Sequence, residues 1–441
     1  MATTDTPDGT TRLTPSNAEP AQQPAAVGSA VPAVKSGWAS RTFESLGHRD
    51  YRMMWISMFL SMGGFNMLML ARGILIYDLT GDAQKTALVS IGWAPGLLIM
   101  SLFGGVLGDR VERRMLIQVS QFANAVFAVT VGFLILTNVI EWWHLMIVST
   151  CQGCVFALQI PARTAAMSQL VPKQLIGNAM ALNATAMTMM SIAAPAVGGV
   201  LYEMIQPEGV YFVVTVMMFL AMGFTTLLPK MYPDQRQSKT KESPLVNIKR
   251  GIVYAARNNL IRVLLIQSVI IAMLSMPFRM LVPVFAKDLY GSVPSEVGWI
   301  ATMAGFGGIA ASMGVASLRA GQRRGWVILL SPVISSISML VIGSFPWYWV
   351  GMIFFIGVGF GESIRWALGQ ALVVEHANPR YRARMTSLTM MTYGLIPIAA
   401  FPVGWLVDNV GVQETVIGMA IALFLAGLFF IAASKSVRNL N

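Results

Sequence analysis

Long apolar runs separated by short polar segments make up most of the chain. A helix needs about 20 apolar residues to cross the hydrocarbon core of a bilayer. Runs of this kind cover residues 51–77, 84–107, 114–138, 143–170, 175–202, 209–229, 260–286, 295–318, 326–345, 347–374, 383–407 and 412–434. The pattern predicts an all-α membrane protein with twelve transmembrane helices.

The polar segments indicate where the domains begin and end. Residues 1–44 are rich in Thr, Pro, Ala and Gln and lack an apolar core, so we expect a disordered cytoplasmic tail there. A second polar segment, "KMYPDQRQSKTKESPLVNIKR", separates the sixth run from the seventh. We therefore predict six-helix bundles over 45–230 and 259–434, a cytoplasmic linker over 231–258 and a cytoplasmic tail over 435–441.

The composition excludes an ordinary soluble protein. Of the 441 residues, 55% are hydrophobic and 12% are charged, whereas a soluble domain has about 25% charged residues. Cys151 and Cys154 lie in one apolar run and the three histidines lie at predicted membrane edges, so we expect no disulfide framework, metal site or cofactor. We expect the lipid bilayer as a partner and no nucleic acid, because the net charge of +11 follows the predicted topology.

Basic residues gather on one side of the predicted membrane. If the N-terminus is cytoplasmic, all but five of the 31 Lys and Arg residues lie in the inner segments and the adjoining helix ends. The outer loops contain Lys85 and Lys287, and acidic residues such as Asp78, Asp288 and Asp408 flank them. Because short cytoplasmic loops are enriched in positive charge, this predicts a plasma (inner) membrane protein with both termini in the cytoplasm.

The two halves of the chain resemble each other. At a shift of 210 residues the matched positions include Asp78 with Asp288, Gly81 with Gly291 and Arg113–Arg114 with Arg323–Arg324, and at a shift of about 206 they include Gly198 with Gly404. Each half has an even number of spans, so both halves enter the membrane in the same direction. Two parallel six-helix repeats around a central cavity are a transporter architecture, with the binding site near the midplane.

A charged loop follows the second predicted span, in the stretch "GVLGDRVERRMLI". Its spacing resembles the loop signature Gly-x-Leu-x-Asp-Arg-x-x-Arg-Arg of the major facilitator superfamily. The matching residues are Gly105, Leu107, Asp109, Arg110, Arg113 and Arg114. Glu112 departs from the usual glycine. Together with the six-plus-six helix pattern, the resemblance covers residues from about 45 to 435.

The resemblance implies that this loop is a conformational latch, in which Asp109 and Arg113 join the second span to the opposite half. The latch is asymmetric, because Arg319 replaces Asp109 at the matching place in the second half. Plain topogenic charge is the alternative, above all for Arg110 and Arg114.

A second element resembles proton-coupled exporters of the same superfamily. In "SIAAPAVGGVLY", Pro195, Gly198 and Gly199 match a Gly-Pro-x-x-Gly-Gly pattern, with Ala194 in place of the first glycine. Ordinary helix packing is the alternative, since glycines allow close approach of helices. The phrases "HRDYRMMWISMFLSMGG" and "ALQIPARTAAMSQLVP" resemble the branch of enterobactin exporters and macrolide-efflux proteins. Ser149 departs from the arginine that many drug exporters have before the Gln-Gly pair of the fourth span.

Ionisable residues at membrane depth are candidates for function, because burying their charge is costly. Glu362 lies about 22 Å beyond Trp347 along a helix, within the membrane, and Arg365 follows on the same face. Glu362 is therefore a candidate proton or substrate site. An internal Glu362–Arg365 pair that never titrates is the alternative, and the sequence leaves the two open.

Further polar residues are candidates for contact with a substrate. Arg279 lies roughly 13 Å deep, and Arg72 lies close enough to the outer end of its span for its side chain to snorkel to the interface. We expect Arg163 to reach lipid headgroups or the inner loops. Polar positions that suit a cavity wall include Asn66, Gln159 and Tyr393.

These features predict a secondary transporter and not an enzyme. We expect a proton-coupled exporter of a hydrophobic or amphiphilic small molecule, drug-like or siderophore-like, that acts by alternating access with protons as the coupling ion. No nucleotide-binding loop and no hydrolase or metalloprotease motif occurs in the sequence. The alternatives are a lysophospholipid flippase, a nutrient importer or a uniporter of the same fold.

Overall fold

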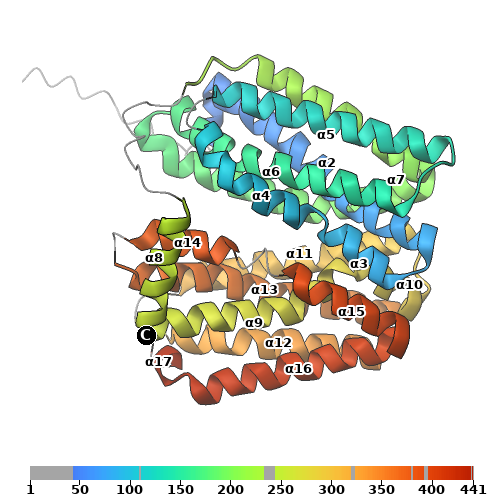
Figure 1. Ribbon diagram of the computed structural model, residues 1–441, viewed down its shortest axis with the longest axis vertical. Helices are drawn as coiled ribbons and strands as arrows, with labels where there is room; N and C mark the ends of the chain where they lie inside the picture. Colours follow the sequence, from blue (N-terminus) through green and yellow to red (C-terminus); the bar gives the residue numbers. More distant parts are fainter. Residues whose placement is uncertain are drawn as a thin grey trace, which may run out of the picture. The chain divides into compact units, whose positions relative to one another are not determined.

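The computed structural model describes residues 43–108, 111–232, 244–318, 323–378, 381–391, 396–438 and 440. The described residues form helices and contain no strand (Figure 1). The first half of the chain comprises η1 (Glu44–Gly47), α2 (Arg49–Thr80), α3 (Ala83–Ile91), α4 (Trp93–Gly108), α5 (Arg113–Leu136), α6 (Trp142–Leu170), η2 (Lys173–Leu175) and α7 (Ile176–Thr226). The second half comprises α9 (Asn259–Met280), α10 (Val282–Tyr290), α11 (Pro294–Ser317), α12 (Arg324–Ser344), α13 (Tyr348–His376), α14 (Arg382–Met391), α15 (Ile396–Val410), α16 (Val412–Ala433) and α17 (Lys435–Arg438). Helix α8 (Pro244–Arg257) lies between the halves in sequence.

The helices follow the predicted apolar runs, which confirms an all-α membrane protein. Within the described part of the chain, nine helices are long and apolar enough to cross a membrane. Helix α7 is one of these nine, although it covers two of the predicted runs. Gln206, between the two runs, has non-helical backbone angles (φ 62°). Three other runs are divided, into α3 and α4, α9 and α10, and α14 and α15. The two parallel six-helix repeats stay a prediction.

Two glycines end their helices in the same way. Gly81 follows α2 with φ 61°, and Gly291 follows α10 with φ 62°. This left-handed conformation is strained for residues with a Cβ and is common at helix C-termini. The sequence comparison matched these two glycines at a shift of 210 residues, and the structure gives them the same local role.

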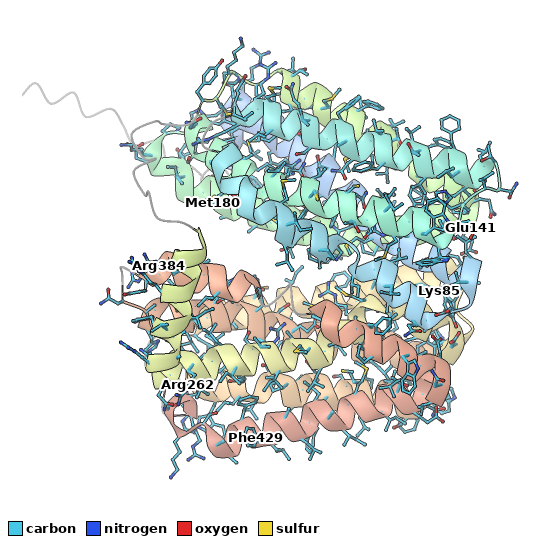
Figure 2. All side chains as sticks on the ribbon, viewed as in Figure 1. Lys85, Glu141, Met180, Arg262, Arg384 and Phe429 are labelled. Carbon is cyan, nitrogen blue, oxygen red and sulfur yellow. The ribbon has the colours of Figure 1, made fainter. Side chains whose placement is uncertain are left out.

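A continuous apolar core joins the two halves. One cluster of buried side chains contains Met67 and Ile74 of α2 together with Phe278 of α9 and Val282 of α10. Other large apolar side chains are exposed, among them Phe429 of α16, which Figure 2 shows on the outside of the helices. Exposed apolar residues in this number are expected for a protein whose outer face lies in lipid.

Glycines, which have no side chain, allow helices of the two halves to approach each other closely. A Cβ atom on Gly199 of α7 would lie 2.5 Å from the carbonyl oxygen of Pro294 on α11. In the reverse direction, a Cβ on Gly298 of α11 would lie 2.5 Å from the carbonyl oxygen of Pro195. A second such contact joins α15 to α3, where a Cβ on Gly404 would lie 2.8 Å from Cα of Gln84. Among the described residues, these glycines therefore bring helix backbones of the two halves close together.

Candidate substrate and coupling site

Glu362 of α13 forms an ion pair with Arg279 of α9. The distance from Arg279 Nη1 to Glu362 Oε2 is 3.1 Å. The glutamate side chain is only 5% exposed, whereas the arginine side chain is 44% exposed. A buried carboxylate is costly unless it is paired, so this contact explains how Glu362 is held inside the span.

Arg365, which the sequence offered as an alternative partner for Glu362, takes a different direction. Its Nη1 donates to Ser268 Oγ on α9 at 3.4 Å. Three residues of spacing place both side chains on one face, but the guanidinium turns toward α9. Among the described residues, Glu362 Oε1 and Arg365 Nε are buried without a hydrogen-bond partner. Glu362 and Arg365 therefore each retain one buried polar atom without a described hydrogen bond.

A cavity of about 210 Å³ lies between the two halves. Asn66 and Arg72 line it from α2, Arg279 from α9 and Phe355 from α13. The remaining lining residues are Met69, Leu70, Ser90, Ser191, Pro195, Met276, Met280, Val282, Pro283, Ala301 and Ala304. Three predicted site residues, Asn66, Arg72 and Arg279, thus lie around one cavity, and Arg279 connects it to Glu362. Such a largely apolar wall with a few polar groups is typical of small-molecule sites.

Arg72 is buried, which makes the prediction of snorkelling wrong. Its side chain is 4% exposed, and Nη1 donates to Gln152 Oε1 on α6 at 2.7 Å. The next residue, Gly73, packs against Pro283 of α10, where a Cβ would lie 2.9 Å from the proline ring. The second half therefore covers this part of α2 and closes the route to the interface. Sequence reasoning noted Gln152 only as part of a Gln-Gly pair and missed its bond with Arg72.

The sequence predicted that Gln159 lines the central cavity, but the structure places it elsewhere. It is buried beside a much smaller space of about 10 Å³ inside the first half. Ser61, Asn124 and Gln152 line the same space. Because Gln152 also binds Arg72, the small space and the large cavity share one polar contact.

Arg163 is buried and does not reach lipid headgroups, whereas the alternative, a contact with the inner loops, stays a prediction. The side chain is 5% exposed, and neither Nη atom has a hydrogen-bond partner in the described part of the chain. Ala162, Ala166 and Met167 beside it belong to a buried apolar cluster of the first half. Position along a helix gave the depth of Arg163 but not the direction of its side chain.

The predicted latch is described only in part. Asp109 and Arg110 lie outside the described residues, as does Tyr393, and Gly105 lies in α4. Arg113 Nη1 donates to the carbonyl oxygen of Ala165 on α6 at 3.1 Å, and Arg114 Nη1 donates to that of Leu228 after α7. These two bonds stay within the first half. A latch through Asp109 stays a prediction.

The exporter-like element contributes to helix contacts. Gly199 faces α11, whereas a Cβ on Gly198 would lie 3.4 Å from Met67 of α2, an ordinary contact distance. Pro195 lines the central cavity. The element therefore joins the cavity wall to the contact between the halves.

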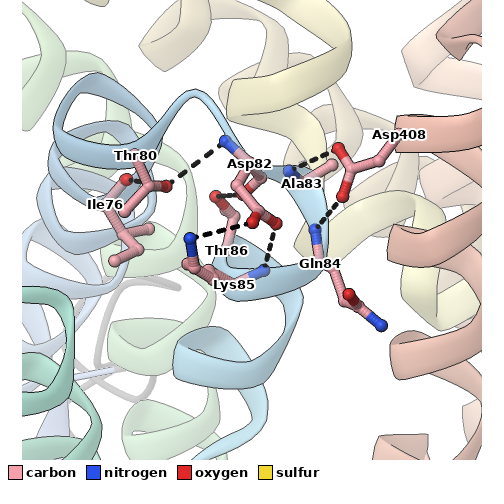
Figure 3. A network of polar contacts seen from close by, with 8 residues as sticks. All are labelled: Ile76, Thr80, Asp82, Ala83, Gln84, Lys85, Thr86 and Asp408. Atoms are coloured by element: carbon pink, nitrogen blue, oxygen red, sulfur yellow. Dashed lines mark hydrogen bonds and ion pairs between the residues drawn. The ribbon is translucent and has the colours of Figure 1, made fainter.

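Polar contacts between the halves gather at one end of the helices, and sequence reasoning did not find them. Tyr77 of α2 donates its hydroxyl to the carboxylate of Asp288 at 2.6 Å, and Lys287 forms an ion pair with Asp78. The carboxylate of Asp408 on α15 accepts hydrogen bonds from two backbone N–H groups at the start of α3 (Figure 3). The distances are 2.8 Å from Ala83 and 2.9 Å from Gln84. We call these three contacts the cross-half contacts. A carboxylate at a helix N-terminus is favourable because the free N–H groups carry partial positive charge.

Two carboxylates at this end have shifted pKa values in opposite directions. Burial and the nearby charge of Asp82 raise the pKa of Asp408, against the lowering effect of its two backbone hydrogen bonds. Burial alone would raise the pKa of Asp82, but its bonds with the backbone and side chain of Lys85 lower it below the usual value. The charge of this acidic pair therefore depends on both partners.

Comparisons with known proteins agree with this architecture. The family described as the Major Facilitator Superfamily matches residues 54–395 and 268–439 of the chain. Among similar proteins, macrolide efflux protein A of Streptococcus pyogenes is 21% identical over 352 residues, which cover 77% of this chain and 85% of that protein. The enterobactin exporter EntS of Shigella boydii is 22% identical over 320 residues, covering 72% and 76%.

One further match is shorter, and another concerns the fold alone. The uncharacterized MFS-type transporter YfiS of Bacillus subtilis is 21% identical over 249 residues, which cover 56% of this chain and 58% of that protein. The crystal structure of the nucleoside transporter NupG superposes with a TM-score of 0.72 at 12% identity, covering 87% of this chain and 99% of that one.

Proposed function

Because this chain belongs to the Major Facilitator Superfamily, we propose that it is a proton-coupled exporter that moves a hydrophobic or amphiphilic small molecule by alternating access. It is a multi-pass membrane transporter with efflux-type relatives, and not an enzyme. We further propose that it lies in the plasma membrane with both termini in the cytoplasm. In Figure 2, Arg262 and Arg384 lie at one end of the helices and Lys85 and Glu141 at the other. The basic end is the cytoplasmic one in this proposal.

The Glu362–Arg279 pair beside the central cavity is the observation that carries the proposal. Glu362 is a buried carboxylate whose Oε2 is paired with Arg279 and whose Oε1 has no hydrogen-bond partner in the described part of the chain, and Arg279 lines the cavity. Protonation of Glu362 removes the negative charge and with it the ion pair. Its protonation state therefore decides whether Arg279 is held or released.

The release of Arg279 makes proton binding and substrate binding mutually exclusive, so that the two alternate. With the pair formed, the charges of Arg279 and Glu362 cancel, and the part of the wall around Arg279 suits an apolar group of the substrate. With Glu362 protonated, the guanidinium is an uncompensated charge on the same wall, and an apolar group beside it is unfavourable because it keeps water from the charge. Such exclusion is what an antiporter requires, since the two cargoes must cross in separate steps.

Access to the cavity must switch between the two sides of the membrane. We assign the cross-half contacts to the outer mouth, because they lie at the end that the topology places outside. In this arrangement the protein is closed toward the outside. Substrate enters from the cytoplasmic side, and it leaves once the cross-half contacts break.

An efflux measurement tests the proposal. Cells that lack their own efflux pumps are loaded with Nile red, an uncharged amphiphilic dye, and are then energised with glucose. We expect faster loss of dye fluorescence in cells that produce the protein, and we expect a protonophore to abolish the difference. Equal loss with and without the protein contradicts export. Export that survives the protonophore contradicts proton coupling and favours a uniporter or a lipid flippase.

A further inference from the structure

Arg72 carries a charge that no described acidic group balances. Its one described hydrogen bond goes to Gln152, a neutral amide. The cavity wall contains no Asp or Glu within the described residues, and Glu362 is bonded to the other arginine, Arg279. The positive charge of the paired Arg279 is therefore compensated, whereas that of Arg72 is not.

The guanidinium of Arg72 has donors to spare. An arginine side chain has five N–H donors in a fixed planar arrangement, and it has no acceptor. The described contact with Gln152 uses Nη1 and fixes the side chain against α6. Because Arg72 also lines the cavity, its remaining donors are available to a molecule there.

We propose that Arg72 sets the charge selectivity of the cavity. It binds the acceptor oxygen atoms of the transported molecule, uncharged or anionic, and it rejects lipophilic cations. The apolar wall around it, including Met69, Met276 and Phe355, receives the remainder of the molecule. This inference rests on the proposed function and names the class of its substrate.

The physical reason is the low dielectric of a site enclosed by helices. A hydrogen bond from a charged donor is roughly twice as strong as one from a neutral donor. A cation placed beside Arg72 meets a like charge, and the described wall contains no carboxylate that would compensate it. Oxygen acceptors are therefore favoured and cations are excluded by the same side chain.

Three small probes with one phenyl ring test the proposal: N,N-dimethylbenzamide is neutral with a carbonyl oxygen, benzenesulfonate is anionic and benzyltrimethylammonium is cationic. The purified full-length protein is placed in phosphatidylcholine nanodiscs, and the melting temperature is followed as each probe is added. Ligands that bind the folded state raise this temperature according to their dissociation constants. No ion gradient is involved.

We expect the benzamide and the sulfonate to stabilise the wild-type protein and the ammonium compound to leave it unchanged. Arg72→Gln should weaken sulfonate binding at least about tenfold, which corresponds to about 1.4 kcal/mol, and should admit the ammonium compound. Arg72→Lys should continue to exclude the cation, because it keeps the charge. Arg163→Gln, which replaces another buried arginine outside both cavities, should behave as the wild type does.

Equal stabilisation by all three probes in the wild type overturns the proposal, as does absence of binding by both oxygen-bearing probes. Unchanged sulfonate binding in Arg72→Gln, or binding of the cation to Arg72→Lys, overturns it as well. These outcomes are separate from a failure of proton-coupled export. If export proves to be independent of protons, the three probes should still differ in binding as described. If the probes bind without charge selectivity, the proposal of proton-coupled export is not affected.

Discussion

Tyr77 and Asp288 lie on opposite halves of the protein, and the tyrosine hydroxyl donates to the carboxylate at 2.6 Å. The neighbouring residues make the reverse contact, in which Lys287 of the second half pairs with Asp78 of the first. A shift of 210 residues matches Tyr77 with Lys287 and Asp78 with Asp288. Each dipeptide thus binds the acid of its counterpart, as in the self-complementary contacts of a two-fold dimer.

Reversing one charge in this reciprocal contact should open the mouth that it closes. Lys287→Asp places a carboxylate opposite Asp78 and replaces attraction with repulsion. Exposed ion pairs contribute about 0.2–1 kcal/mol, so we expect up to roughly a fivefold rise in the open population. The population is measured as the distance distribution between spin labels at Thr137 and Phe345, in a background with Cys151 and Cys154 replaced by serine.

The exchanged pair is the control for this measurement. Asp78→Lys combined with Lys287→Asp restores opposite charges in swapped positions, and the distances should return toward those of the parent protein. Distances that stay unchanged in Lys287→Asp would show that the pair does not hold the mouth closed.

The close contact of α7 with α11 predicts different effects for two adjacent glycines. A methyl group on Gly199 meets the carbonyl oxygen of Pro294, which belongs to a helix backbone and has little room to move. A methyl group on Gly198 meets Met67 at an ordinary distance. Overpacking typically costs about 1–3 kcal/mol. Gly199→Ala should therefore lower the melting temperature and slow export, whereas Gly198→Ala should have much smaller effects. Equal effects of the two substitutions would contradict the described helix contact.

The raised pKa of Asp408 predicts that acid favours the closed mouth. In the closed state burial and Asp82 raise this pKa, whereas a mouth that has opened exposes the side chain to water and returns its pKa toward the usual value. The closed state then binds the proton more tightly. This contribution is fully present below the usual carboxyl pKa and is lost as the pH rises through the raised value.

The same pair of spin labels tests this prediction, with distances recorded between about pH 7 and about pH 4. The closed population should increase on acidification. Asp82→Asn removes the neighbouring negative charge, lowers the pKa of Asp408 and should shift the transition to lower pH. An acid-induced opening, or a transition that Asp82→Asn leaves in place, would be inconsistent with the assigned cause.

The sequence predicted the helices well because membrane thickness fixes their length and apolar composition marks them. It also matched Gly81 with Gly291, whose backbone conformation is a local property of helix ends. Depth in the membrane followed from counting residues along a helix. Counting placed Glu362 inside a span, and the structure describes it as buried there.

Spacing and depth along each helix did not predict which residues pair with the buried charges. Spacing suggested Arg365 as the partner of Glu362, but the partner is Arg279, which lies 83 positions earlier in the chain. Arg72 was expected to reach the interface, but α10 packs beside it and its side chain binds Gln152. Such outcomes depend on how each helix is rotated and on which helix lies next to it, and one sequence contains neither.

The most direct test of the account is proton movement through Glu362. Everted membrane vesicles are acidified inside, and a pH-sensitive dye reports the internal pH when Nile red is added. Glu362→Gln is compared with the wild type and with Glu375→Gln, an exposed glutamate on the same helix that pairs with Arg324. We predict dye-evoked proton release in the wild type and in Glu375→Gln, and its loss in Glu362→Gln. Release that persists in Glu362→Gln would contradict the assignment of Glu362 as the proton carrier.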